Sequence, residues 1–336
     1  MVVSRIPVIA LTGYLGAGKT SVLNHLLSAP GARVGVVIND FGDINVDAAL
    51  VSGQIDKPAS IAGGCLCCLP DGGRLDEALD TLSAPRLGLD AIVVEASGIA
   101  EPAALARLIH VSREPRIRPG GVIEVIDAAA WFDTVDTGRL PPVRLEIASL
   151  VVVNKVDRLP LSRREATLGR IEGRIRARNT YAPIMRTSEG RIDPALVFDA
   201  RAREDPDDQL PLAAAARDGH PHHEHADAVT VAATGPADAG RLIELLEGPP
   251  AGVYRLKGSL TLRTGEGTGR YVADVVGRDV HVSEAAHRTG DEGLVAIGPH
   301  LDTDAVRERV ASALAPAEAP DPDGVRRLEH YLRWYD

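Results

Sequence analysis

The stretch from Gly13 to Thr20 reads Gly-Tyr-Leu-Gly-Ala-Gly-Lys-Thr, and it limits the fold of this chain more than any other. It fits the pattern G-x-x-x-x-G-K-T, in which a glycine-rich backbone cradles phosphate groups. An apolar run over residues 6–12 precedes it, and residues 21–27 follow with helical apolar spacing. The order strand, glycine loop, helix predicts an α/β sheet with helices on both faces and a polyphosphate site.

The chemistry of this loop assigns a role to each part of it. Glycines let the backbone approach phosphate oxygens, and the first turn of the next helix adds a positive dipole end. We expect the ammonium group of Lys19 to face the β- and γ-phosphates and the hydroxyl of Thr20 to bind Mg²⁺. The residues expected to bind the phosphates are Gly13, Gly16, Ala17, Gly18, Lys19, Thr20 and Ser21.

A second apolar run, over residues 90–98, ends in an acid. This is the Walker-B pattern, in which a carboxylate at the end of a buried strand reaches the Mg²⁺ shell. Here the acid is Glu95, and the backbone N–H of Gly98 is placed to meet the γ-phosphate. The predicted catalytic residues are therefore Lys19, Thr20 and Glu95.

The segment over residues 150–157 is an apolar strand followed by the pattern N-K-x-D. A carboxylate at Asp157 accepts hydrogen bonds from the ring N–H and the exocyclic amine of guanine, a donor pair that adenine lacks. The stem of Lys155 is expected to lie over the base, and Asn154 to brace the loop. A last strand and loop over residues 183–188 would support the base. The pattern predicts GTP as the nucleotide.

The three cysteines of the chain lie within four residues of one another, at Cys65, Cys67 and Cys68. A disulfide framework would spread them along the chain, whereas clustered thiols favour a zinc-type ion or redox chemistry. Because Cys67 and Cys68 are adjacent, at most two thiols are expected to bind one ion. Asp43, Asp40, a histidine or a second chain would complete the site, and a redox or buried-thiol role stays open.

The remaining chain indicates three further segments after a first domain over residues 1–198. Residues 199–227 form an acidic linker whose cluster from His220 to His225 either binds metal weakly or is merely solvated. Residues 228–316 show the order strand, helix, three strands, helix of a small α+β domain, with residues 269–282 expected as one strand. The tail over residues 317–336 is an amphipathic helix that docks on the body or contacts a partner.

Composition restricts the partners of the chain. A net charge of −10 argues against nucleic-acid binding. No stretch is long and apolar enough to cross a bilayer, so we expect no membrane partner. The short apolar run at the start leads directly into the glycine loop, which argues against a signal peptide and favours a cytoplasmic protein.

The combined motifs have a counterpart in a known family. Gly-Gly-Cys-Leu-Cys-Cys between the glycine loop and Glu95, with N-K-x-D and a His-containing linker, resembles the CobW-type metallochaperone GTPases, relatives of the urease and hydrogenase maturation GTPases. The resemblance covers nearly the whole chain and implies a P-loop NTPase sheet followed by a CobW C-terminal-like domain. It implies GTP hydrolysis with Mg²⁺, coupled to handling of zinc or cobalt. A client metalloprotein is the expected partner, and a homodimer is a second expected assembly.

By this resemblance, the C-x-C-C motif of Cys65, Cys67 and Cys68 binds the metal together with Asp43. The segment over residues 39–43 reads N-D-F-G-D where the family commonly has N-E-F-G-E, and Ile38 stands where some relatives carry an acid. Both changes alter the expected metal site. Two alternative functions remain: a metal buffer that does not use GTP, and a dedicated activator of one metalloenzyme, such as nitrile hydratase or cobalamin-pathway cobalt insertion.

Replacement of Asp157 by Asn should weaken GTP binding and favour a xanthosine nucleotide, because the Asn amide donates a hydrogen bond to the extra xanthine carbonyl. Calorimetric titration of both chains with GTP, ATP and xanthosine triphosphate measures this exchange. Equal affinity of the unaltered chain for ATP and GTP would contradict the guanine assignment.

Overall fold

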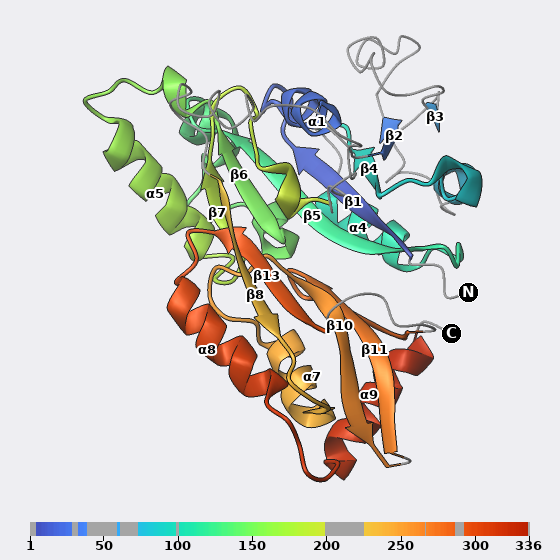
Figure 1. The fold of residues 1–336 in the computed structure, drawn as a ribbon. Coiled ribbons are helices and arrows are strands. Elements are labelled where there is room, and N and C mark those ends of the chain that lie inside the picture. The colour runs from blue at the N-terminus through green and yellow to red at the C-terminus, as the bar shows by residue number, and fades with distance from the viewer. Residues whose placement is uncertain are drawn as a thin grey trace, which may run out of the picture.

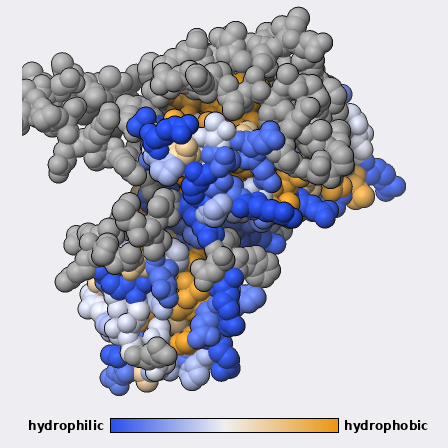
Figure 2. Space-filling model, turned by 90° about the vertical axis from the view of Figure 1, so that its right-hand side faces the viewer, coloured by the Kyte–Doolittle hydropathy of each residue, from blue (hydrophilic) through white to orange (hydrophobic). Residues whose placement is uncertain are grey.

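The computed structural model describes residues 5–28, 33–38, 59–60, 73–98, 101–198, 225–265, 267–285 and 292–334. These residues form two domains, each built on its own sheet (Figure 1). Hydrophilic side chains cover most of the coloured surface in Figure 2, with smaller hydrophobic patches on both domains. None of the helices within the described ranges has the length and hydropathy that crossing a membrane requires.

The N-terminal domain contains a seven-stranded parallel sheet in the order β3-β2-β4-β1-β5-β6-β7. Its strands are β1 Ile6–Gly13, β2 Val34–Ile38, β3 Ala59–Ser60, β4 Ala91–Glu95, β5 Ile117–Asp127, β6 Leu150–Asn154 and β7 Ile184–Arg186. The order reverses at β1, which pairs with β4 on one side and β5 on the other. Ligands of open parallel sheets bind at such reversals, beyond the carboxyl ends of the strands.

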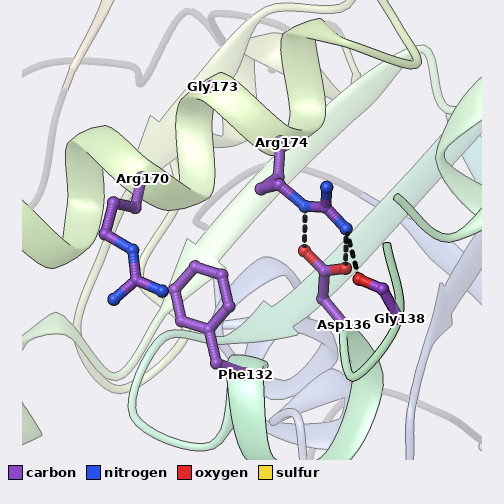
Figure 3. A pocket seen from close by; sticks show the side chains of 6 residues that line it. All are labelled: Phe132, Asp136, Gly138, Arg170, Gly173 and Arg174. Carbon is purple, nitrogen blue, oxygen red and sulfur yellow. Dashed lines mark hydrogen bonds and ion pairs between the residues drawn. The ribbon is translucent and has the colours of Figure 1, made fainter. Parts of the chain in front are cut away.

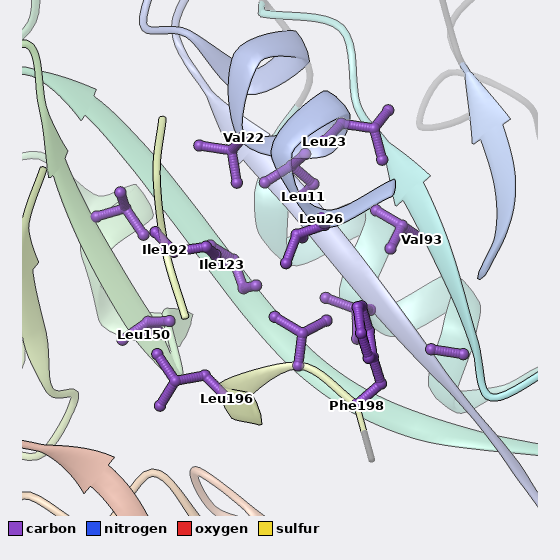
Figure 4. Packing of buried hydrophobic residues seen from close by; sticks show 14 of the residues in the cluster. Leu11, Val22, Leu23, Leu26, Val93, Ile123, Leu150, Ile192, Leu196 and Phe198 are labelled. Atoms are coloured by element: carbon purple, nitrogen blue, oxygen red, sulfur yellow. The ribbon is translucent and has the colours of Figure 1, made fainter. Parts of the chain in front are cut away.

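Helices cover both faces of this sheet, as the sequence predicts. They are α1 Lys19–Leu27, α3 Gly73–Leu82, α4 Pro102–His110 and α5 Arg164–Arg176, with short turns η2 Pro85–Leu87, η3 Trp131–Val135, η4 Val143–Ile147, η5 Val156–Arg158 and η6 Pro194–Leu196. Ile9 and Leu11 pack with α1 on one face (Figure 4), whereas Val8 and Ala10 pack with α3 and α4 on the other. Because both faces are covered, successive residues of β1 from Ile6 to Leu11 are all apolar.

The C-terminal domain contains a second sheet in the order β12-β11-β10-β13-β8, with β9 paired to β10. Its elements are β8 Ala226–Ala232, β9 Ala237–Asp238, α7 Ala239–Glu247, β10 Arg255–Thr264, β11 Gly267–Val276, β12 Asp279–Glu284, β13 Gly293–Pro299, α8 Thr303–Leu314 and α9 Pro322–Trp334. The prediction of one strand over residues 269–282 was wrong. Val276 pairs with Asp279 across a tight turn in which Gly277 has a φ of 61°, so the segment forms an antiparallel hairpin.

The tail docks on the body of the C-terminal domain. Helix α9 packs against α7 and β12, and its residue Leu328 is buried in the core of that domain. Tyr331 donates a hydrogen bond from its hydroxyl to Glu247 at 3.0 Å, and Arg327 forms an ion pair with the same carboxylate at 2.6 Å. Of the two alternatives for the tail, the structure therefore supports packing on the chain itself.

The turn of the β11–β12 hairpin joins the two domains. Asp274 of β11 pairs with Arg118 of β5 at 2.7 Å and with Arg255 of β10 at 3.1 Å, and all three side chains are nearly buried. Asp279 pairs with His110 of α4 at 3.0 Å. The domain contact is thus a charged cluster whose strength depends on protonation.

The buried imidazole of His281, on β12, makes this contact sensitive to acid. Burial lowers its pKa to about 4, and the charges of Arg118 and Arg5 act in the same direction while Asp274 opposes them. The unfolded chain takes up the proton near pH 6.5 and the folded chain does not. The contribution of this neutral imidazole to the free energy of unfolding is therefore fully present above pH 6.5. It is lost as the pH falls toward 4, a change of roughly 3 kcal/mol.

His281→Gln should flatten this part of the pH dependence of unfolding, measured by denaturant titration between pH 7 and pH 4.5. The matched control is His330→Gln, because His330 is exposed on α9. An unchanged pH profile in His281→Gln would contradict a neutral buried imidazole.

Candidate nucleotide site

The glycine loop has a backbone that only glycine can adopt at its critical positions. Gly18 has a φ of 103°, and a Cβ there would lie 2.2 Å from Nδ2 of Asn154. A Cβ on Gly13 would lie 2.4 Å from the carbonyl oxygen of Val125 on the neighbouring strand. The loop thus packs closely on β5 and on the end of β6, and helix α1 begins directly after it at Lys19.

Side-chain donors bind the carbonyl oxygens of this loop. Lys19 Nζ donates to Gly13 O at 3.0 Å, Asn154 Nδ2 to Ala17 O at 3.0 Å and Lys155 Nζ to Gly16 O at 2.5 Å. With its carbonyl groups occupied in this way, the loop can present its N–H groups to an anion. The two predicted motifs, glycine loop and N-K-x-D, therefore lie against each other.

The residues predicted to handle Mg²⁺ also meet. Thr20 Oγ1 donates to Glu95 Oε1 at 3.2 Å, and Glu95 ends β4 with only 3% of its surface exposed. Gly98 packs closely on the loop, since a Cβ there would lie 2.5 Å from the backbone nitrogen of Leu15. A hydroxyl and a carboxylate oxygen side by side are a donor set that suits a hard cation such as Mg²⁺.

The loop after β6 is held in a fixed shape. Asn154 is buried, and besides its bond to Ala17 it accepts a hydrogen bond from Gly190 N at 3.0 Å. Lys155 has a left-handed φ of 61°, and Asp157, two residues later, is exposed. Gly190 belongs to the loop after β7 and packs on the first turn of α1. The base-recognition loop predicted from the sequence therefore borders both the phosphate loop and the segment expected to support the base.

Two groups next to this site escaped the sequence analysis. Asp127, at the end of β5, forms an ion pair with Lys155 at 2.6 Å. Like Glu95, Asp127 is an acid at the end of an apolar strand, and that pattern could have marked it as a site residue. The other group is Glu124, which is fully buried and accepts a hydrogen bond from Thr12 at 2.6 Å.

Burial raises the pKa of Glu124, while the charge of Arg144 and the hydroxyl of Thr12 oppose that effect. Arg144 pairs with Glu124 at 2.5 Å and stacks its guanidinium on the ring of Tyr14 in the glycine loop. Arg144 lies in the short turn η4, where no sequence pattern indicates a partner. The pair supports the glycine loop from the side of β5.

Two cavities lined by described residues of this domain can be compared with the predicted site. One of about 140 Å³ is lined by residues 14–17 of the glycine loop, by residues 125–127 of β5 and by Lys155. The other, about 350 Å³, lies between η3 and α5, where Arg174 pairs with Asp136 and Arg170 stacks on Phe132 (Figure 3). The second cavity contains none of the residues predicted from the sequence, so the first is the one that belongs to the nucleotide site.

The predicted metal ligands Cys65, Cys67, Cys68 and Asp43 lie outside the described residues, as do Asp40 and residues 220–224. Among the side chains that the structure does describe, no three His, Cys, Asp or Glu residues come together as a metal site. Thr20 and Glu95, which are predicted to hold Mg²⁺, are described, whereas the predicted ligands of the transferred metal are not. The cysteine site therefore remains a prediction.

Comparison with known proteins identifies both domains. Residues 7–186 match the family model "CobW/HypB/UreG, nucleotide-binding domain", and residues 226–314 match "Cobalamin synthesis protein cobW C-terminal domain". The chain is 28% identical to the zinc chaperone CobW of Sinorhizobium sp, over 92% of this chain and 97% of that protein.

Two other relatives match over shorter stretches. The zinc chaperone YjiA of Escherichia coli is 29% identical over 57% of this chain and 61% of that protein. The zinc-regulated GTPase metalloprotein activator 1 of Schizosaccharomyces pombe is 32% identical over 56% of this chain and 47% of that protein. The aligned region thus spans about half to three fifths of these two relatives.

Glu95→Gln should lower nucleoside triphosphate hydrolysis roughly tenfold or more, because the amide still accepts the Thr20 hydrogen bond but no longer offers Mg²⁺ a negative charge. The Mg²⁺ concentration for half-maximal rate should rise, while nucleotide binding without Mg²⁺ stays unchanged. Phosphate release at a series of Mg²⁺ concentrations measures both effects.

The control for this variant is Glu101→Gln, an exposed acid six residues further along. Lys19→Ala, which removes the charge facing the phosphates, should abolish hydrolysis. A Glu95→Gln variant with the Mg²⁺ dependence of the unaltered chain would refute the Walker-B assignment.

Proposed function

Since this chain belongs to the CobW/HypB/UreG family, we propose that it hydrolyses GTP and uses the nucleotide cycle to bind a divalent metal ion, zinc first, and pass it to a client protein. Cobalt is the second candidate metal. The observation that carries the nucleotide part is the bonding of Asn154 and Lys155 to the carbonyl groups of the glycine loop. These bonds make the phosphate and base loops one unit.

The proposed hydrolysis uses groups whose positions are described. Lys19 neutralises charge on the β- and γ-phosphates, Thr20 and Glu95 hold Mg²⁺, and Asp157 is exposed to accept the guanine donors. We expect turnover on the order of 10⁻⁴ to 10⁻² s⁻¹, as in GTPases that switch between states without a stimulating partner. The contact between Thr20 and Glu95 supports a working Mg²⁺ site and speaks against a metal buffer that does not use GTP.

The proposed metal site is linked to the nucleotide site through β2. Ile38, the last residue of β2, pairs in register with Glu95 at the end of β4. Asp43 follows β2 in the chain, whereas the cysteines follow β3, whose Ser60 pairs in register with Ile38, so both stretches leave the sheet within two strands of the Walker-B carboxylate. Closure of the first stretch on the γ-phosphate would change the distance between Asp43 and the thiols. Two ligand arrangements of different metal affinity would follow.

The names of the relatives support zinc as the metal. Two relatives are called zinc chaperones, and a third is called a zinc-regulated metalloprotein activator. Thiolates bind zinc-type ions well, and an incomplete ligand set exchanges its ion more readily than a closed tetrahedral site. We propose Cys65, Cys67, Cys68 and Asp43 as the residues that hold the ion before transfer.

Replacing all three cysteines by Ser should remove tight zinc binding and leave GTP binding intact, because the thiols lie on a separate segment from the glycine loop. Cys67→Ser should have the largest effect of the single changes. Competition with a chromophoric chelator measures the affinity, and a weakly buffered titration measures the protons released as thiols ionise. A triple variant that binds zinc like the unaltered chain would show that the main metal site lies elsewhere.

A further inference from the structure

The carboxylate of Asp127 uses both of its oxygen atoms. Oδ1 accepts backbone hydrogen bonds from Ala129 at 2.9 Å and Ala130 at 3.2 Å, which turn the chain away from the sheet at the end of β5. Oδ2 accepts from Lys155 Nζ at 2.6 Å. The two backbone hydrogen bonds fix the orientation of the Asp127 carboxylate, and the carboxylate then fixes the position of the Lys155 ammonium group.

Lys155 needs contacts from other parts of the chain to hold its side chain, because its local backbone conformation is itself unfavourable. Its left-handed φ of 61° is unfavourable for a residue with a side chain and is seen mainly where neighbouring contacts enforce it. Its ammonium group spans from the end of β6 to two partners, Asp127 on β5 and Gly16 O in the glycine loop. Less than a fifth of either side chain, Lys155 or Asp127, is exposed, so water screens their attraction only partly.

The position of the pair connects it to base recognition. Asp127 and Asn154 are register partners at the ends of adjacent strands, so the carboxylate lies next to the first residue of the N-K-x-D loop. Both Asp127 and Lys155 line the cavity of about 140 Å³ beside the glycine loop. Because the ammonium group of Lys155 is bound to both Asp127 and Gly16 O, the side-chain stem of the lysine is held in one conformation beside this cavity.

We propose that Asp127 is a positioning residue for guanine selection, acting through Lys155: it keeps the lysine stem where it supports the base that Asp157 recognises. This inference rests on the proposed GTP specificity. Asp127 touches neither base nor phosphate in this account, so its effect passes entirely through the lysine. The competing explanation is that Asp127 only ends strand β5, in which case its loss would weaken all nucleotides alike.

Asp127→Asn separates the two explanations, because the amide oxygen can still accept from Ala129 and Ala130 while the amide nitrogen cannot accept from the lysine. GTP affinity should fall about five- to tenfold, the scale of one charge-assisted hydrogen bond, and ATP affinity should not change. Lys155→Met should give the same loss of discrimination. Adding Asp127→Asn to Lys155→Met should have no further effect, because the lysine is already gone.

The measurement is calorimetric titration of the full chain with GTP and ATP in the presence of Mg²⁺, together with the thermal midpoint of each variant without nucleotide. Asp133→Asn is the matched control, since Asp133 is an exposed acid in the turn that follows and should leave both affinities unchanged. Equal loss of GTP and ATP affinity in Asp127→Asn, or additive effects with Lys155→Met, would overturn the positioning role. An unaltered chain that binds ATP and GTP equally would instead refute the proposed base specificity.

Discussion

The hydrogen bonds of Asn154 hold the site together. Its amide nitrogen donates to Ala17 in the glycine loop, and its amide oxygen accepts from Gly190 in the loop after β7. One buried side chain thus joins the ends of three strands, β1, β6 and β7. Losing a buried amide with two partners costs about 1–3 kcal/mol for each group left unsatisfied. Phosphate cradle, base loop and supporting loop would then no longer be fixed relative to one another.

Strand β5 brings a second set of contacts to this centre and extends to the other domain. Near its start, Arg118 pairs with Asp274 of the C-terminal hairpin, and at its end Asp127 pairs with Lys155. Between them, Glu124 anchors Arg144 beneath Tyr14 of the glycine loop. A single strand therefore contacts both the nucleotide site and the domain interface. A conformational change at the nucleotide site could therefore reach the C-terminal domain through the backbone of β5.

Much of this could be predicted because the signals were local. The glycine loop, the strand ending at Glu95 and the N-K-x-D loop are each encoded within about ten residues, and a parallel sheet brings their ends together whatever the remaining detail. The hairpin at Gly277 was missed because its turn takes only two residues, Gly277 and Arg278, and apolar residues stand close on both sides of it. The tail was left open, since an amphipathic helix has the same pattern whether it covers its own domain or a partner. Asp127 and Arg144 depend on partners 28 and 20 residues away, which no local pattern reveals.

The central claim is that nucleotide state sets metal affinity. It rests on the register of Glu95 with Ile38 and of Ile38 with Ser60, the strand ends that precede Asp43 and the thiols in the chain. The most direct test is zinc affinity of the full chain, by competition with a chromophoric chelator, without nucleotide, with GDP and with a non-hydrolysable GTP analogue. We expect the GTP-analogue form to bind zinc most tightly, by roughly 5- to 150-fold, and zinc to tighten the analogue by the same factor. Identical zinc affinities in all three states would contradict the account.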